Sequence, residues 1–303
     1  MRNLQKSKTC ESCVSSERKL SVVRNEAGRA VRYAVFGAPT SERVVFYSHG
    51  FPASRVEAGI AHQVALDCGL SIVALDRPGF GGSEWYGNRE FRDWADDVVA
   101  VANHLGIKRF GVLGVSGGTP TAVAAAALLK DRVTKLVVVS GMGPLSGRKV
   151  LRGMNFGNRL LLELGLMLPR IARCAIALIA TAWKRFPVLV SVWFGALLPS
   201  VDREIVRRRE IGVLFAKNIK EALSQGVKGV RTEFGLLLTD WSALLENVQV
   251  PTEIWHGDAD TYVPFAMAES LHTRIKNSVL HKVSGGGHFM IVDTLPAVLG
   301  SFA

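Results

Sequence analysis

A serine, an aspartate and a histidine occur in the order and settings in which such groups form a nucleophilic triad. Ser116 lies in the pentapeptide Gly114-Val115-Ser116-Gly117-Gly118, between a Val/Leu-rich run and an Ala-rich run. A G-x-S-x-G turn between a strand and a helix exposes its serine and needs small residues two positions to either side. The pattern predicts that Ser116 is a nucleophile, with Gly114 and Gly118 as the supporting small residues. The alternative is a Gly-rich turn with an N-capping serine.

The base and acid that would activate such a serine are expected later in the chain. His288 follows three consecutive glycines, which predicts a flexible, exposed loop, whereas His256 is embedded at a strand end. We therefore favour His288 as the general base, with a structural histidine as the alternative for both. Asp258 and Asp260 compete for the role of the orienting acid, and we favour Asp260.

The runs around these residues predict alternating strands and helices. Buried parallel strands are expected over 43–50, 70–76, 109–116 and 134–141, further strands over 251–258 and 278–283, and helices over 91–106, 119–130, 264–275 and near the end of the chain. A hairpin is expected over 21–37, with its turn at Asn25 to Gly28. The chain is therefore predicted to be α/β, with a mostly parallel central sheet and helices on both faces. The N–H of Gly117 would then lie at a helix N-terminus, where it can stabilise an oxyanion.

The alternation of strands and helices stops in the middle of the chain. Residues 145–235 have no convincing β-run and predict several helices, broken at Gly153, Gly157, Pro169, Pro187 and Pro199. We predict an inserted helical cap over 145–235, a core formed by 20–144 and 236–303, and a flexible tail over 1–19.

Together these motifs resemble the α/β-hydrolase superfamily over the whole chain except the tail, and most weakly in the cap. The resemblance is carried by Ser48-His49-Gly50-Phe51-Pro52, by DRPGFGGS at 76–83, by the Ser116 turn, by Gly257-x-x-Asp260-x-x-Val263-Pro264 and by Gly287-His288-Phe289. It implies that Asp260 is the acid and that Phe51 supplies a second oxyanion N–H group beside Gly117. It also implies that His49 and Gly50 are structural residues of that loop.

The resemblance implies a serine hydrolase that cleaves a carboxylic ester of an apolar or amphiphilic small molecule through an acyl-enzyme, as carboxylesterases and lipase-like enzymes do. A serine at position 116 argues against haloalkane dehalogenases and epoxide hydrolases, which carry aspartate there. Perhydrolase-like haloperoxidases, carbon–carbon bond hydrolases and iminopeptidases use the same triad and stay open as alternatives. A non-catalytic binding protein of this fold is disfavoured by the intact triad, and no metal or organic cofactor is required.

The net charge of +11 is concentrated in one segment. The predicted cap has 16 basic and 6 acidic side chains, residues 1–20 have 5 and 2, and the remainder has 16 and 18. No nucleic-acid module or basic strip with interleaved aromatic residues is visible, so nucleic acid is not expected as a partner. A basic and apolar cap favours an anionic amphiphile or peripheral contact with a membrane. The run Arg207-Arg208-Arg209 is either a solvated helix face or part of such a contact.

Two further segments bear on the cellular setting. Cys10 and Cys13 form a C-x-x-C in the polar tail, a weak signal for a zinc or thiol site. The same tail lacks an apolar leader, so a cytoplasmic location is expected. The apolar stretch 174–198 is interrupted by Lys184-Arg185 and by Pro187, which leaves pieces too short to cross a bilayer. Burial of this stretch or its contact with an interface stays open.

Overall fold

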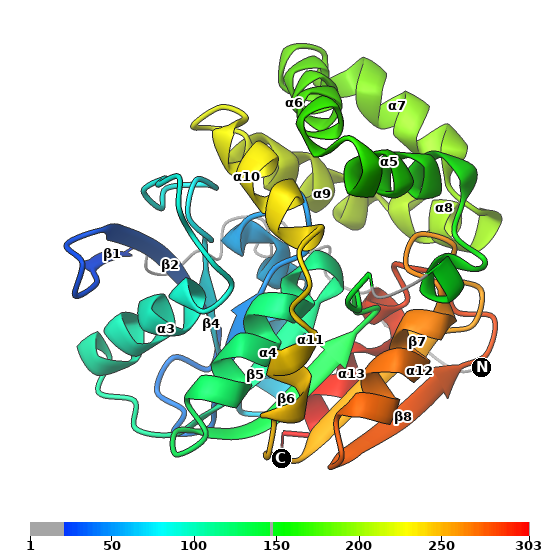
Figure 1. Ribbon diagram of the computed structural model, residues 1–303. Helices are drawn as coiled ribbons and strands as arrows, with labels where there is room; N and C mark the ends of the chain where they lie inside the picture. The colour runs from blue at the N-terminus through cyan, green and yellow to red at the C-terminus, as the bar shows by residue number, and fades with distance from the viewer. Residues whose placement is uncertain (1–20, 146–147, 303) are drawn as a thin grey trace, which may run out of the picture.

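The structure is a computed structural model that describes residues 21–145 and 148–302, and it is built on an eight-stranded sheet (Figure 1). In sheet order the strands are β1 (Ser21–Arg24), β2 (Ala30–Gly37), β4 (Ser71–Leu75), β3 (Val44–Ser48), β5 (Phe110–Val115), β6 (Val133–Val139), β7 (Thr252–Gly257) and β8 (Ser278–Val283). The strands from β4 to β8 in this order pair in parallel, whereas β2 pairs antiparallel with both β1 and β4. The predicted tail, with Cys10 and Cys13, lies outside the described residues.

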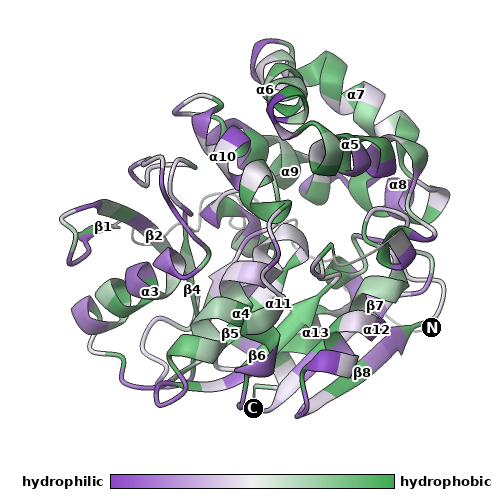
Figure 2. Cartoon of the chain, in the orientation of Figure 1, coloured by the Kyte–Doolittle hydropathy of each residue, from purple (hydrophilic) through white to green (hydrophobic). Residues whose placement is uncertain are grey.

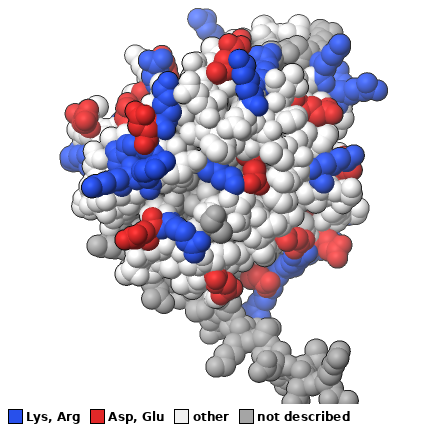
Figure 3. All heavy atoms as spheres, turned by 90° about the horizontal axis from the view of Figure 1, so that it is seen from below, with Lys and Arg blue, Asp and Glu red and all other residues white. Residues whose placement is uncertain are grey.

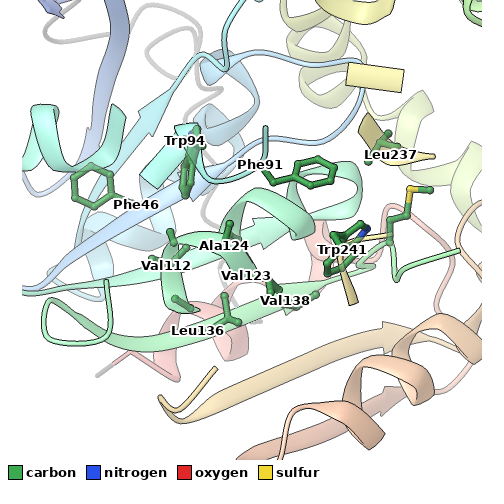
Figure 4. Close-up of a cluster of buried hydrophobic side chains, with 14 of the residues drawn as sticks. Phe46, Phe91, Trp94, Val112, Val123, Ala124, Leu136, Val138, Leu237 and Trp241 are labelled. Atoms are coloured by element: carbon green, nitrogen blue, oxygen red, sulfur yellow. The ribbon is translucent and has the colours of Figure 1, made fainter. Parts of the chain in front are cut away.

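The central strands are buried on both faces, which explains their almost continuous apolar sequences. Every residue of β3, β4 and β5 is buried. Consecutive residues point to opposite faces of a strand, so Phe46 and Tyr47 enter two different apolar clusters, as do Val112 and Leu113. Figure 4 shows part of the first cluster, where Trp94 packs above the sheet.

Helices cover both clusters. On the face of Phe46 lie α3 (Asp93–His104), α4 (Thr119–Leu128), α11 (Ser242–Glu246) and α12 (Phe265–Arg274), and on the other face lie the 3₁₀ helix η1 (Arg55–Ala61), α2 (His62–Asp67) and α13 (Ile291–Gly300). The predicted α/β fold with a mostly parallel sheet and helices on both faces is therefore confirmed. The segment η1–α2 was not expected from the sequence, because it is short and carries no clear helical period.

The inserted helical cap stands over the carboxyl ends of the parallel strands (Figure 1). After the short helix η3 (Arg148–Leu151) it comprises α5 (Phe156–Met167), α6 (Pro169–Arg185), α7 (Pro187–Leu197), α8 (Ser200–Arg207), α9 (Arg209–Ala222) and α10 (Lys228–Leu237). Pro169 and Pro187 are the first residues of helices, where a missing N–H costs nothing. The expected break at Gly157 is wrong, because that residue lies in the first turn of α5. The domain boundary predicted after residue 235 falls inside α10.

No single helix within the described residues is long and apolar enough to cross a membrane. Helices α6 and α7 meet the length and composition criteria only when taken together, and they are bent by 119° at their junction.

Buried charges fasten the cap to the core. Glu233 of α10 is fully buried, lies 2.8 Å from the Nε of Arg77 and also pairs with Arg89. Arg55 of η1 pairs with Glu221 of α9 at 2.7 Å. Charged groups are tolerated at such depth only when they are paired and hydrogen-bonded. These contacts therefore fix how the cap sits on the core.

Replacing Glu233 by Gln is expected to lower the free energy of unfolding by about 3 to 5 kcal/mol, because Arg77 and Arg89 lose their buried counter-charge. Equilibrium unfolding in urea measures the loss. The matched control is Glu163→Gln, which breaks the partly exposed Arg159–Glu163 pair (2.9 Å) and should cost no more than about 0.5 kcal/mol. Similar losses in the two variants would contradict a special role for Glu233.

Candidate active site

Ser116 occupies a strained turn between β5 and α4. Its φ is +50°, in the left-handed region that non-glycine residues rarely adopt. A Cβ on Gly114 would lie 2.6 Å from the Cβ of Ala122, and one on Gly118 would lie 2.3 Å from the carbonyl oxygen of Ser48. Neither position has room for a side chain, so both glycines are needed for α4 to pack this closely on the strands.

The structure brings Ser116, His288 and Asp260 together in one hydrogen-bonded chain. The Nε2 of His288 lies 3.0 Å from the Ser116 Oγ, and its Nδ1 lies 2.8 Å from Oδ2 of Asp260. The other carboxylate oxygen of Asp260 accepts the backbone N–H groups of Tyr262 (2.8 Å) and Val263 (2.9 Å). When Nδ1–H donates to Asp260, Nε2 is free to accept the serine proton.

The competing residues, Asp258 and His256, make different contacts. Asp258 sits on the outer side of the turn, where it accepts the Gly285 N–H at 2.7 Å and pairs with Lys282 at 3.2 Å. The Nε2 of His256, a buried side chain, lies 2.7 Å from the carbonyl oxygen of Val263. The geometry thus pairs Asp260, rather than Asp258, with His288. His256 also approaches Asp260, at 3.4 Å from Oδ2, but His288 is the histidine that is hydrogen-bonded to Ser116.

The expectation that His288 lies on an exposed loop is wrong. Its side chain is only 12% exposed, and the Ser140 hydroxyl donates to its carbonyl oxygen at 3.0 Å. Asp202 of α8 accepts the Phe289 N–H at 2.8 Å, and a Cβ on Gly287 would lie 2.4 Å from this carboxylate. Glycine at 287 therefore gives room for a cap residue. No sequence motif marks Asp202 or Ser140.

Opposing effects set the pKa values of the Asp260–His288 pair. Burial would raise the pKa of Asp260, but the positive charge of His288 and hydrogen bonds from His256 and His288 hold it well below its ordinary value. Burial would lower the pKa of His288, but the charge and hydrogen bond of Asp260 raise it. Both shifts favour the charged forms, an imidazolium beside a carboxylate, and only the neutral form of His288 could accept a proton.

The peptide between Gly50 and Phe51 is held in one orientation. Arg77 donates to the Gly50 carbonyl oxygen at 2.9 Å. Nε2 of His49 accepts the backbone N–H of Arg77 at 3.2 Å, which leaves Nδ1 as a second donor to the same carbonyl, 2.9 Å away. In a planar trans peptide the N–H points opposite to the carbonyl, so that of Phe51 turns away from Arg77. Its nitrogen would be 3.4 Å from a Cβ on Gly117, and both residues line the same pocket.

Glu57 of η1 is a pocket residue that no sequence motif revealed. Its Oε2 accepts the Gly50 N–H at 2.6 Å. A Cβ on Gly50 would lie 3.1 Å from its Oε1 and 3.6 Å from the Cβ of Ser116, so the carboxyl group is close to the serine. Burial raises the pKa of Glu57 to about 7, although the Gly50 N–H and the charge of Arg77 lower it.

The triad opens into an apolar cavity of about 280 Å³ between the cap and the core. The cap lines it with Leu161, Ile176, Trp183, Phe194, Phe215 and Phe234, and the core with Phe51, Glu57, Ser116, Gly117, Tyr262 and His288, among others. Such a cavity suits a small apolar group held next to the serine. Among the described residues, no group of three or more His, Cys, Asp or Glu side chains could hold a metal ion.

Replacing Glu57 by Gln is expected to make the stability of the protein less dependent on pH. Because the pKa of Glu57 is raised to about 7, its stabilising contribution is complete below the ordinary glutamate pKa and is lost as the pH rises through about 7. The glutamine oxygen can still accept the Gly50 N–H but carries no charge.

Urea unfolding at about pH 5 and about pH 8.5 measures this effect, and the loss of stability should be about 2 kcal/mol smaller in Glu57→Gln than in the wild type. Comparing the two proteins cancels the titration of groups that do not interact with Glu57. His288 is not among them, because the Glu57 charge raises its pKa, so the comparison is repeated in a His288→Gln background. The same pH dependence in both would contradict a partly buried Glu57 whose pKa is raised.

Comparison with known proteins finds similarity to proteins of the α/β-hydrolase fold. Residues 43–158 match a family model described as alpha/beta hydrolase fold. The chain is 27% identical over 269 residues to a non-heme haloperoxidase of Rhodococcus erythropolis, and the aligned region covers 86% of this chain and 92% of that protein. It is 33% identical to a bifunctional esterase/perhydrolase of Acinetobacter calcoaceticus over 129 residues, 42% of this chain and 46% of that protein.

Solved structures share the fold over nearly the whole chain. A bromoperoxidase from Bacillus anthracis superposes with a TM-score of 0.69 at 22% identity, over 94% of this chain and 99% of that one. A thermophilic esterase from Thermogutta terrifontis has a TM-score of 0.64 at 20% identity, over 93% and 96% of the two chains. These comparisons agree with the sheet order and the inserted helices: the chain has the α/β-hydrolase fold.

Proposed function

We propose that the protein is a serine hydrolase that cleaves a carboxylic ester of an apolar or amphiphilic small molecule through an acyl-enzyme. The observation that carries the proposal is the hydrogen-bonded chain from Ser116 through His288 to Asp260. It opens into a cavity lined mainly by apolar side chains. Esterases are also among the relatives and the solved structures that resemble this chain.

In the proposed reaction, His288 takes the proton of Ser116 as the serine attacks the ester carbonyl. The N–H groups of Phe51 and Gly117 stabilise the oxyanion, and Asp260 stabilises the imidazolium and holds its orientation. His288 then protonates the leaving alcohol, and water releases the acyl group by the reverse sequence. Activity rises with pH as His288 loses its proton, and the midpoint lies above the ordinary histidine value because Asp260 raises its pKa.

Replacing Ser116 by Ala is expected to lower the turnover of p-nitrophenyl esters on the order of 10⁶-fold, because the nucleophile is lost. The wild type should also be labelled covalently by a fluorophosphonate, and Ser116→Ala should not. Ser200→Ala, at an exposed serine that begins α8, is the control and should keep both properties. Unchanged turnover in Ser116→Ala would overturn the proposed mechanism.

Perhydrolysis is the second candidate, favoured by the likeness to a haloperoxidase and to an esterase/perhydrolase. In that reaction hydrogen peroxide replaces water as the acceptor of the acyl group from Ser116, and a peracid leaves. Measuring peracid and free acid released from the same p-nitrophenyl esters separates the two activities. A series of increasing acyl length also reports how far the cavity extends.

A further inference from the structure

The outward side of helices α6 and α7 exposes an unusual amount of apolar surface. Leu178, Phe186, Val188, Leu189, Val192 and Trp193, here called the cap apolar surface, are each between 56% and 76% exposed. Helix α7 is apolar almost throughout, yet none of its residues is buried. Figure 2 shows it as a mainly hydrophobic helix at the edge of the molecule farthest from the sheet. A helix that is hydrophobic all round is normally covered on every side.

The pocket accounts for only the inner side of these helices. Trp183 of α6 packs against Phe194 of α7, with ring centroids 5.2 Å apart, and Phe194 stacks on Phe215 of α9 at 5.7 Å. The Trp183 Nε1 donates to the Ser191 hydroxyl at 3.1 Å, which ties the two helices together. The bent pair therefore has two apolar sides, one toward the cavity and one that faces away from the protein.

Positive charge accompanies the outer side. Residues 156–197 contain five basic side chains and one acidic side chain, Glu163, which pairs with Arg159. Arg173 is turned inward, with its Nε buried near Gly235 of α10, so the remaining exposed basic residues are Arg170, Lys184 and Arg185. Lys184 and Arg185 end α6 directly before Phe186 and are exposed, and the Lys184 Nζ also donates to the Ser224 carbonyl oxygen at 3.3 Å. In contrast, Figure 3 shows basic and acidic side chains interspersed on the face seen from below. Apolar side chains beside unbalanced basic ones are typical of helices that lie in an anionic membrane interface.

We propose that the cap apolar surface, together with Lys184 and Arg185, docks on the surface of an anionic lipid bilayer. The exposed Trp193 suits the boundary between headgroups and acyl chains, and the long basic side chains can reach the headgroups. The 119° bend between α6 and α7 lets the pair lie in the interface instead of crossing the bilayer. A second copy of the chain is a less favourable partner for the cap apolar surface, because it would bring the same positive charges face to face.

Docking does not depend on the proposed esterase activity, but it has a consequence for it. Trp183 and Phe194 line the cavity from the inner side of the docked helices. An apolar substrate dissolved in the bilayer would therefore be close to the pocket. Vesicle binding tests docking without any turnover, so failure of one proposal is distinguishable from failure of the other.

Flotation of the full-length protein with phosphatidylcholine vesicles, with and without phosphatidylserine, tests the proposal. The wild type should float with the anionic vesicles, less with the neutral ones, and less in high salt. Leu189→Glu should weaken anionic-vesicle binding by at least about tenfold, because it places a charge in the apolar contact. The control is Leu128→Glu, at an exposed leucine (47%) at the far end of α4, and it should bind normally.

The charges have a matched control in the sequence itself. Lys184→Gln with Arg185→Gln should weaken binding to anionic vesicles by about tenfold or more. Lys108→Gln with Arg109→Gln removes two charges of the same kind from an exposed Lys-Arg pair just before β5. This pair lies at the amino-terminal end of the strand, away from the cap, so its loss should have little effect on binding. Circular dichroism of each variant establishes that it is folded.

Three results would overturn the proposal. The first is a wild type that floats with neither kind of vesicle. The second is an equal loss of binding in the Lys184/Arg185 and Lys108/Arg109 variants, which would assign any binding to overall charge. The third is a wild-type dimer without lipid that Leu189→Glu converts to a monomer, which would show that a second copy covers the surface.

Discussion

The contacts of one buried guanidinium link the loop at Gly50 and Phe51 to the cap. Arg77 is fully buried, donates to the Gly50 carbonyl oxygen at 2.9 Å and lies 2.8 Å from Glu233 of α10. A buried cation needs its partners. If the loop moved away, Arg77 would lose its carbonyl acceptors, and if the cap moved away it would lose its counter-charge Glu233. The orientation of the Phe51 N–H and the seating of the cap are thus consequences of the same side chain.

The neighbouring aspartate completes this buried network. Asp76 accepts the backbone N–H groups of Arg55 (2.8 Å) and Gly82 (2.9 Å) and pairs with the Arg55 guanidinium at 2.5 Å. A Cβ on Gly81 would lie 2.0 Å from its carboxylate, so glycine is required there. The Asp-Arg pair and the glycines of the motif at 76–83 therefore support the site, although none of them touches the reacting atoms.

The sequence predicted what depends on local patterns and missed what depends on distant contacts. The strands and Ser116 are marked by short apolar runs and a tight glycine turn, and the structure places them as expected. Gly287 shows the limit: glycine is read as flexibility, but here its missing side chain makes room for Asp202, which is 85 positions away in the chain. The sequence did not indicate Glu57 for the same reason: its environment depends on its contacts with Gly50 and on the cavity, and neither is visible in the local sequence.

In the cap, an apolar sequence pattern predicts that side chains are covered, but it does not indicate whether the core, a ligand or an external surface covers them. Its contacts with the core include buried charges such as Glu233, its inner side lines the cavity through Trp183, and its outer side exposes Val192 and Trp193. Helices that cover a sheet usually turn their apolar side inward and their charges outward. In α6 and α7 apolar residues lie on both sides, so their spacing alone could not distinguish packing on the core from contact with an interface. The buried charges hold the cap on the core and leave those outer apolar side chains exposed to solvent. The basic residues beside them are the reason that the proposed partner is a negatively charged surface.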